Sequence, residues 1–354
     1  MNATTPAIYP QAELDSIKNI LAGAQRIVIL QADNPDGDSL GSALALEHIL
    51  GDLGKEPFLY CGADIPSYLS YFDGQDRVSK ELPAQFDASI IVDTSADSLL
   101  ENLAVTQQKG WIKSKPVILL DHHATEATID YATVSCNKTA VATGEVIYEL
   151  AQQLDWPLNL DAKTLIASSI LSDSLGLTTE ATSARSIAII SELVASGVSI
   201  PKLEQKRREL MRKSVELTHY KGALLQRVEY FADNRVAMVT IPWDEIQEYS
   251  PQYNPSMLVL DDMRLTTNVR VGIAFKLYGD GHLTAKIRAN YGSPIAGKLA
   301  EHFGGGGHTY ASGFKLAAGR PFNEVKSECI EVARKLLENL ERDTDHETTQ
   351  HPNA

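Results

Sequence analysis

The sequence predicts an α/β protein of two domains, in which a parallel-sheet domain is joined by a helical linker to a smaller α+β domain. The first half alternates short apolar runs with helical patterns, an order typical of parallel strands connected by helices. The second half has two apolar runs joined through GDG, which indicates an antiparallel hairpin. The length of 354 residues accommodates two cores of ordinary size.

Four apolar runs of the first half are predicted to be buried strands, because they are rich in Ile, Val and Leu and lack polar alternation. They lie at 26–30, 57–61, 88–93 and 116–121. Helical patterns are present at 39–53, 139–155, 161–172 and 184–196. These elements form the first domain, which we place at 1–197.

We place the helical linker at 198–220 and expect the part near 198–215 to act as the hinge between the domains. Its basic residues are Lys206, Arg207, Arg208, Arg212 and Lys213. A nucleic-acid-binding patch is one interpretation of this cluster. Because Glu204 and Glu209 are interleaved with the basic residues, we favour a solvated helix face.

The second domain is placed at 221–341. Its predicted elements are strands at 235–241, 268–278 and 282–289, a helix at 293–303, the tract GGGGH, a short strand near GFKL, and a helix at 321–341. The polar segment 342–354 is predicted to be disordered. His346 and His351 lie in that segment, and we assign them no role.

Composition and charge narrow the range of functions. A net charge of −14 argues against binding along extended nucleic-acid duplexes, which depends on clustered Lys and Arg, but allows short or small anions at a local cationic pocket or metal centre. No apolar run is long enough to cross a bilayer, and the N-terminus lacks a secretory pattern. Cys61, Cys136 and Cys329 are too dispersed for a disulfide framework or a thiolate zinc site. We therefore expect a cytoplasmic protein without membrane contact.

Acidic and histidine side chains recur where the predicted elements of the first domain end. They are Asp36 and Asp38 after the first strand, Asp93 at the end of the third, Asp121, His122 and His123 at the end of the fourth, and Asp173 after a helical pattern. Each residue alone has a structural alternative as a turn, capping or hydrogen-bonded residue. Because the carboxyl ends of parallel strands form the ligand crevice of an α/β sheet, we expect these residues to converge.

Several carboxylates with one or two imidazoles and no thiolate are typical of a site for Mn²⁺ or Mg²⁺, and less selectively for Fe²⁺, Co²⁺ or Zn²⁺. Two such ions require one carboxylate to bridge them and further ligands on each side. Alternate residues of the D-x-D turn at Asp36 and Asp38 can face adjacent ions. The implied chemistry is hydrolysis of a phosphoester.

The motifs NPDGDSLGS, VDTS, LLDHHAT and ILSDSLG, followed by GGGGHTYASGF, resemble those of the DHH/DHHA1 phosphoesterase family over nearly the whole chain. The layout is most similar to the oligoribonucleases (nanoRNases) that also dephosphorylate 3′-phosphoadenosine 5′-phosphate. The resemblance implies two divalent cations, with Mn²⁺ preferred and Mg²⁺ or Co²⁺ as alternatives.

The same resemblance implies a role for each residue of the first domain. Asp36 would bind the first metal, Asp38 the second, and Asp93 would bridge both. His122 and Asp173 would complete the second metal site, and His123 would face the substrate phosphate. Asp121 would orient the histidines.

One position departs from the family pattern. Relatives usually carry a histidine four residues before the first aspartate of the D-x-D pair, and this chain has Ala32 there. The first metal site therefore lacks an expected ligand, for which Gln31, Asp33, Asn34 or water would have to compensate. Some relatives of the RecJ exonuclease type also lack this histidine.

The second domain carries the candidate substrate-binding residues Arg288, Gly304, Gly305, Gly306, Gly307 and His308. A glycine run can serve as a flexible joint, but this one lies inside a domain, where its backbone N–H groups can approach a phosphate or base. The planar guanidinium of Arg288 suits a phosphate, and a surface role on an edge strand is its alternative. Arg264 and Arg270 are weaker candidates.

The leading functional hypothesis is metal-dependent hydrolysis of RNA fragments a few nucleotides long to 5′-mononucleotides, together with removal of the 3′-phosphate of phosphoadenosine phosphate. A phosphodiesterase for cyclic di-AMP or its linear form is the second enzymatic hypothesis. Ala32 also allows a non-catalytic nucleotide-binding sensor. Exonuclease action on long single-stranded DNA is disfavoured because the chain has no evident OB-fold extension or basic surface. The sequence does not decide between a monomer and a homodimer.

Overall fold

The computed structural model describes residues 8–123 and 127–350, with side chains described as far as Arg342. The chain forms two compact units, Met1–Arg212 and Lys213–Ala354. The division lies inside the segment expected to be the linker. Each unit contains its own sheet and core, so the predicted fold class is confirmed.

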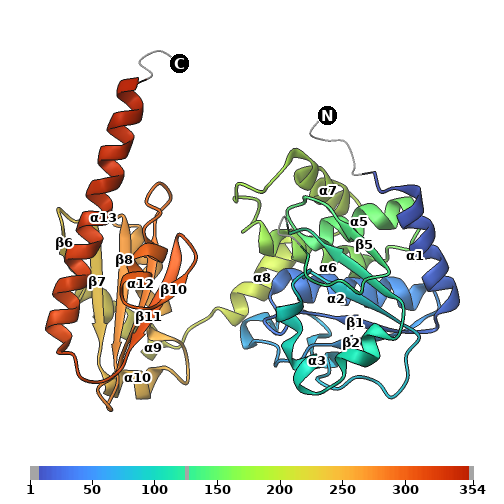
Figure 1. The fold of residues 1–354 in the computed structure, drawn as a ribbon, viewed down its shortest axis with the longest axis horizontal. Helices are drawn as coiled ribbons and strands as arrows, with labels where there is room; N and C mark the ends of the chain where they lie inside the picture. Colours follow the sequence, from blue (N-terminus) through green and yellow to red (C-terminus); the bar gives the residue numbers. More distant parts are fainter. Residues whose placement is uncertain (1–7, 124–126, 351–354) are drawn as a thin grey trace. The chain divides into compact units, whose positions relative to one another are not determined.

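The first unit is built on a five-stranded parallel sheet with the order β2-β1-β3-β4-β5 (Figure 1). Its strands are β1 (Arg26–Leu30), β2 (Glu56–Tyr60), β3 (Ala88–Val92), β4 (Val117–Asp121) and β5 (Val134–Asn137). The four predicted strands are present. The edge strand β5 was not predicted, because its four residues VSCN carry no continuous apolar run.

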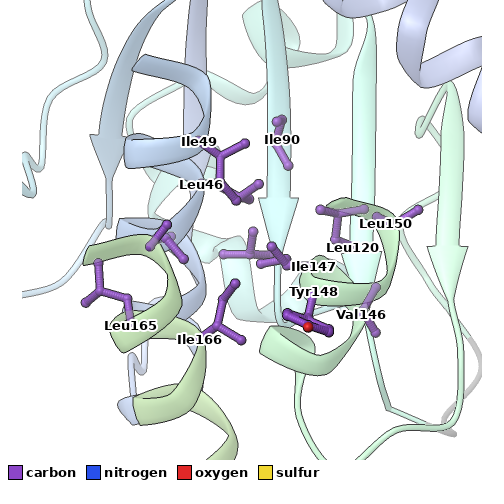
Figure 2. Packing of buried hydrophobic residues seen from close by; sticks show 14 of the residues in the cluster. Leu46, Ile49, Ile90, Leu120, Val146, Ile147, Tyr148, Leu150, Leu165 and Ile166 are labelled. Atoms are coloured by element: carbon purple, nitrogen blue, oxygen red, sulfur yellow. The ribbon is translucent and has the colours of Figure 1, made fainter. Parts of the chain in front are cut away.

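The main core of this unit lies between one face of the sheet and three helices, α2 (Gly37–Asp52), α5 (Thr143–Leu154) and α6 (Leu160–Asp173). Figure 2 shows Leu46 of α2, Ile147 of α5 and Ile166 of α6 packed with Ile90 and Leu120 of the sheet. The opposite face is covered by shorter helices. The remaining helical elements of the unit are α1 (Gln11–Gly23), η1 (Ser67–Leu69), η2 (Gln75–Arg77), η3 (Asp97–Leu100), α3 (Glu101–Val105), α4 (Lys109–Lys113), α7 (Ala184–Ala195) and α8 (Ile200–Leu210).

The second unit contains a six-stranded sheet with the order β10-β11-β9-β8-β7-β6, in which only β7 and β8 are parallel. Its strands are β6 (Glu229–Phe231), β7 (Val236–Ile241), β8 (Val271–Leu277), β9 (Leu283–Ala289), β10 (Gly306–Gly307) and β11 (Ala311–Leu316). Its helices are α9 (Val215–Gln226), α10 (Trp243–Tyr249), α11 (Pro255–Arg264), α12 (Ala296–His302) and α13 (Phe322–Gln350). The GDG hairpin between β8 and β9 is present as predicted.

Two helical segments differ from the sequence-based expectation. The linker is two helices, because the Ser214 side chain accepts a hydrogen bond from the Leu217 N–H and starts α9 as a separate helix. The final helix, α13, continues to Gln350 rather than ending near 341, since no Gly or Pro interrupts it before Pro352. It thus extends into the segment expected to be disordered, whose residues 351–354 lie outside the described structure.

Within the described residues, no single helix is long and apolar enough to cross a membrane. Only α7 and α8 taken together, which are bent by 99° relative to each other, have sufficient length and apolar character.

Candidate metal centre

The residues expected to converge lie at the carboxyl ends of three neighbouring strands and on two helices. Asp93 follows β3, and the DHH triplet begins at the last residue of β4. Asp36 and Asp38 lie at the start of α2, which follows β1. Asp173 is the last residue of α6, a helix that packs against α2. Because β1, β3 and β4 are adjacent in the sheet, their ends place these side chains in one region.

His122 is at the centre of the cluster. Its Nε2 atom lies 3.5 Å from Asp38 Oδ2, 3.4 Å from Asp93 Oδ1 and 3.5 Å from Asp173 Oδ2. Ligand atoms about 2.1 Å from one ion are about 3.0 to 3.4 Å from each other, so this spacing suits atoms that share a metal ion. The Nδ1 atom lies 3.1 Å from the Ala140 carbonyl oxygen. Because a carbonyl only accepts hydrogen bonds, the proton is on Nδ1 and the Nε2 lone pair is left for a metal.

Two groups of side chains in the described structure have the geometry of metal-ligand sets. They are Asp38, His122 and Asp173, and Asp93, His122 and His123, each with donor atoms within 4.8 Å of one another. Carboxylate oxygens and imidazole nitrogens without a thiolate fit a divalent ion such as Mn²⁺, Mg²⁺, Co²⁺, Fe²⁺ or Zn²⁺. These residues therefore fit the cofactor class expected from the sequence.

Asp38 is buried and held by four donors. Its Oδ1 accepts hydrogen bonds from the hydroxyls of Ser42 and Ser169 and from the Gly144 N–H, and its Oδ2 accepts one from the Thr143 N–H at 2.7 Å. The two N–H groups belong to the first turn of α5, whose dipole favours a negative charge. This arrangement fixes the orientation of the Asp38 carboxylate, whose other partner is His122.

The carboxylates of the centre repel one another. Burial, followed by the charges of Asp38 and Asp36, raises the pKa of Asp93 well above its usual value. Burial and the charge of Asp38 raise the pKa of Asp173 to about 6. Asp93 also has left-handed backbone with φ of 59°, and its Oδ1 accepts a hydrogen bond from the Thr143 hydroxyl at 3.1 Å. A divalent cation would offset this repulsion.

Asp121 contacts both histidines, but in different ways. Its Oδ1 accepts hydrogen bonds from the backbone N–H groups of His122 and His123 and lies 2.7 Å from His123 Nδ1. Burial alone would raise the pKa of Asp121, but hydrogen bonds from His123 and Ser95 outweigh burial and lower it. The Asp121 hydrogen bond raises the pKa of His123. Asp121 thus orients the ring of His123, whereas the ring of His122 is oriented by a backbone carbonyl.

Asp36 lies beside the centre rather than in either ligand group. Its Oδ1 accepts hydrogen bonds from the N–H groups of Asp38 and Ser39, both at 3.0 Å, and so caps α2. The capping alternative for the D-x-D turn is therefore realised in this residue. Its assignment to a first metal stays a prediction.

The three residues that were expected to compensate for Ala32 lie in three different surroundings. Asp33 Oδ2 accepts a hydrogen bond from the Asn102 N–H in α3, on the other face of the sheet. Gln31 is fully buried, and neither atom of its amide group has a hydrogen-bond partner among the described residues. Asn34 is exposed. None of the three belongs to a ligand group of the described structure.

The sequence analysis missed the residues that support Asp38. Ser42 lies four positions after Asp38 on α2, a spacing that places both on one helix face and that could have been recognised. Ser169 and Thr143 come from other helices more than a hundred residues away. Ser169 donates through its hydroxyl and Thr143 through its backbone N–H, so no local sequence pattern indicates either contact.

Gly144 is expected to be essential to this support. A Cβ atom there would lie 2.1 Å from Ser169 Oγ, so Gly144→Ala must displace a side chain that binds Asp38. We expect a loss of about 1 to 3 kcal/mol in stability and of about 10- to 100-fold in metal affinity. Gly51→Ala, where a Cβ meets nothing within 4 Å, is the control and should stabilise the protein slightly. Thermal melting and metal titration measure both; equal metal affinity in the two variants would contradict the role of Gly144.

The second unit places some of the expected substrate-binding residues together. Arg288, Gly304 and Gly305 line a pocket of about 760 Å³. Gly306 and Gly307 form β10, and a Cβ on Gly305 would lie 2.3 Å from the Gly313 carbonyl oxygen, so the tract packs closely against β11 rather than forming a loose joint. His308 is exposed and does not line this pocket.

The weaker arginine candidates lie elsewhere in the second unit. Arg264 is paired with Asp261. Arg270 lines a different pocket, of about 440 Å³, together with Asp233 and Glu341.

Comparison with known proteins supports the resemblance to the DHH family that the sequence motifs indicated. A sequence model of the DHH family, N-terminal domain, matches residues 26–172. The chain is 24% identical over 332 residues to the bifunctional oligoribonuclease and PAP phosphatase NrnA of Mycoplasma pneumoniae, covering 91% of this chain and 97% of that protein. It is 24% identical over 297 residues to the protein of the same name from Bacillus subtilis, covering 82% of this chain and 89% of that protein.

The fold is also found among solved structures. An exopolyphosphatase-related protein from Bacteroides fragilis superimposes with a TM-score of 0.78 at 20% identity, covering 94% of this chain and 100% of that chain. The matched family domain includes β1 to β5 and every residue of the candidate metal centre except Asp173. The first unit of the chain therefore carries a segment that matches the DHH family, N-terminal domain, and most of the chain is similar to proteins named as oligoribonucleases and PAP phosphatases.

Proposed function

We propose that this protein is a metal-dependent hydrolase that cleaves short oligoribonucleotides to 5′-mononucleotides and removes the 3′-phosphate of 3′-phosphoadenosine 5′-phosphate. The observation that carries the proposal is the convergence of three carboxylates from three separate elements on Nε2 of His122. Similarity to oligoribonuclease and PAP phosphatase proteins over most of the chain supports this choice of substrates.

The proposed cofactor is a pair of divalent cations, with Mn²⁺ preferred and Mg²⁺ or Co²⁺ as substitutes. Asp38, His122 and Asp173 would hold one ion, Asp36 the other, and Asp93 would contact both. When bound, such ions supply a hydroxide nucleophile at neutral pH and neutralise charge on the phosphate. We expect the two sites to differ in affinity, because Asp38, His122 and Asp173 form an assembled ligand group in the described structure, whereas Asp36 belongs to neither of its two ligand groups.

His123 is proposed to contact the substrate phosphate. Its side chain is 49% exposed, whereas that of His122 is only 11% exposed. Asp121 occupies Nδ1 of His123, so Nε2 is the ring atom left for an external group. Because the hydrogen bond to Asp121 raises the pKa of His123, this ring is well suited to hold a proton and donate a hydrogen bond to a phosphate oxygen.

The proposal is tested by product analysis on three substrates with Mn²⁺ and with EDTA. The substrates are a 5′-phosphorylated RNA dinucleotide, 3′-phosphoadenosine 5′-phosphate and cyclic di-AMP. Release of mononucleotides from the dinucleotide and of phosphate from the second substrate, only with Mn²⁺, is the expected result. Preferred turnover of cyclic di-AMP would replace this function with a cyclic-dinucleotide phosphodiesterase, and nucleotide binding without turnover of any substrate would indicate a sensor.

A further inference from the structure

The chain between β5 and α5 contacts three of the side chains that gather at the candidate metal centre. This support segment, defined as residues 140–144, offers them one carbonyl oxygen, two N–H groups and one hydroxyl. The contacts are from Ala140 to His122, from Thr143 and Gly144 to Asp38, and from Thr143 to Asp93. A displacement of the support segment would therefore move proposed ligands of both ions.

The support segment has no capping side chain of its own. Ala142 is the N-cap residue of α5, and its methyl group cannot accept a hydrogen bond. Helices usually begin with Ser, Thr, Asp or Asn at this position, because such a side chain binds the free N–H groups of the first turn. Here the N–H groups of Thr143 and Gly144 donate to Asp38 instead. The segment can hold Asp38 in place, rather than follow its movements, only if a second contact fixes the start of α5.

Glu145 supplies this second contact. It is the third residue of α5, and only 6% of its surface is exposed. Its Oε2 accepts a hydrogen bond from the Ser186 hydroxyl at 2.8 Å and a longer one from the Val141 N–H at 3.5 Å. A glutamate at the third helical position that reaches back to an N–H before the helix resembles one half of a capping box. Glu145 therefore ties the support segment to the first turn of α5 and ties both to α7.

The surroundings of Glu145 compensate for its burial. Burial raises the pKa of Glu145, whereas the hydrogen bonds from Ser186 and Val141 and the charge of Arg185 oppose this rise. A buried carboxylate opposes folding unless hydrogen bonds and charges offset its loss of hydration. Glu145 is not among the ligands proposed for either ion or for the substrate. Its burial with dedicated partners therefore indicates a different role.

The α7 side of this contact is firmly anchored. Ser186 is fully buried, and α7 begins with a capping box in which Ser183 and Ser186 exchange hydrogen bonds. One turn further along α5, Glu149 accepts a hydrogen bond from Arg185 at 2.7 Å. Thus α7 binds α5 through two buried carboxylates four residues apart, of which Glu145 lies at the helix end that continues from the support segment.

We propose that Glu145 is a positioning residue of the metal centre. Its carboxylate holds the support segment against α7, and the segment in turn fixes the His122 ring and the Asp38 carboxylate in the orientation that binds metal. Glu145 acts only through the support segment. The inference rests on the proposed function, to which it adds a residue outside the set of metal ligands.

The test compares two substitutions of Glu145 in the full-length protein. Methionine resembles glutamate in length but accepts no comparable hydrogen bond, whereas the side-chain oxygen of glutamine can accept both bonds. We expect Glu145→Met to lower the affinity for Mn²⁺ about 10- to 100-fold. Glu145→Gln should stay within about threefold of the wild type. Both affinities are measured by calorimetry, starting from the metal-free protein.

Glu149→Gln is the matched control for a loss of stability. Glu149 is a buried acid of the same helix with a partner on α7, so its replacement weakens the same helix interface. The variant should melt lower than the wild type, because Arg185 loses a charged partner. Its Mn²⁺ affinity should remain within about threefold of the wild type. The comparison with Glu145→Met thereby separates positioning from stabilisation.

A second pair of variants removes the donor instead of the acceptor. Ser186→Ala deletes the hydroxyl that binds Glu145 and leaves every residue of α5 unchanged. Ser183→Ala is its control, because Ser183 is the N-cap of the same helix and binds the Ser186 N–H. We expect Ser186→Ala to weaken Mn²⁺ binding about three- to tenfold and Ser183→Ala less than about twofold. This pair decides the question if Glu145→Met does not fold.

Turnover at saturating Mn²⁺ gives a further readout. Glu145→Met should lower kcat for the RNA dinucleotide about 10-fold or more and leave KM within about threefold, because the orientation of the metal ligands affects the chemical step. A raised KM with unchanged kcat would contradict the positioning role.

The metal affinities decide the inference independently of turnover. Wild-type Mn²⁺ affinity in folded Glu145→Met and in Ser186→Ala, or an equal loss of affinity in their controls, would overturn the inference. Weaker binding in these two variants without the same loss in Glu149→Gln and Ser183→Ala would support it. That support would hold even if the wild type hydrolyses none of the substrates, in which case only the proposed function fails.

Discussion

Replacing Asp93 with Asn is expected to lower kcat for the RNA dinucleotide by about 10³-fold or more. Asp93 follows β3. In the sheet, β3 lies between β1, which precedes the D-x-D turn, and β4, whose last residue begins the DHH triplet. Its Oδ1 is 3.4 Å from His122 Nε2, and the carboxylate is buried. Asparagine keeps the size of the side chain but removes the negative charge, so the variant should fold while losing the ligand expected to serve both ions.

Bound metal distinguishes a ligand from a structural residue, because the amount of bound Mn²⁺ would not change if Asp93 had only a structural role. Mass spectrometry of the dialysed protein should find less bound Mn²⁺ in Asp93→Asn than in the wild type. Asp161→Asn is a matched control, since Asp161 is an exposed acid in the first turn of α6, at the end of that helix opposite Asp173. Full turnover and unchanged Mn²⁺ content in Asp93→Asn would show that the metal centre has been assigned to the wrong residues.

Addition of Mn²⁺ is expected to raise the melting temperature of the first unit strongly. An ion at 100 times its Kd stabilises the folded state by about 2.7 kcal/mol, and each kcal/mol corresponds to about 2 to 4 °C for a unit of this size. We therefore expect a shift of about 5 to 10 °C. The metal-free centre amplifies the effect, because among the described residues the histidines His122 and His123 are the positive charges that offset the repulsion on Asp93 and Asp173.

Asp173→Asn should reduce the rise in melting temperature that Mn²⁺ causes. In the metal-free protein, the same substitution should raise the melting temperature. In the folded state the pKa of Asp173 is raised to about 6, above its usual value of 3.8. The protonated Asp173 therefore stabilises the folded state at a pH below the usual pKa of 3.8, and this stabilisation is lost as the pH rises through the folded-state pKa of about 6. At pH 7.5 without metal, Asp173→Asn should melt higher than the wild type, but gain less from Mn²⁺. A shift as large as that of the wild type would remove Asp173 from the ligand set.

Much of the fold could be predicted because its signals are local. The apolar runs that became β1, β3 and β4 are continuous, and the GDG turn specifies a hairpin through glycine geometry. The edge strand β5 and the helices α10 and α11 were missed, since short segments with mixed polarity carry no clear periodicity. The break between α8 and α9 depends on one capping serine, whose effect is visible only once the helix start is known.

The convergence of the candidate residues could be predicted from the sequence, but the hydrogen bonds that hold them could not. Strand order brings the ends of β1, β3 and β4 together, and the acidic and histidine residues at those ends follow from the sequence. The hydrogen bonds from Ser169 and Thr143 to the centre join helices that are remote in sequence, so no local pattern reveals them. The pairing of Asp33 with α3 likewise depends on which face of the sheet its side chain takes.

The carbonyl group that fixes the ring of His122 has a consequence for how the centre tolerates mutation. Every amino acid brings the same main-chain oxygen, so no single substitution at Ala140 deletes this acceptor. The ring of His123, in contrast, is held by a carboxylate that one codon change can remove. A single mutation can therefore alter the proposed phosphate contact of His123 more readily than the tautomer of His122, the proposed metal ligand, so we expect substrate preference to diverge more freely than metal binding.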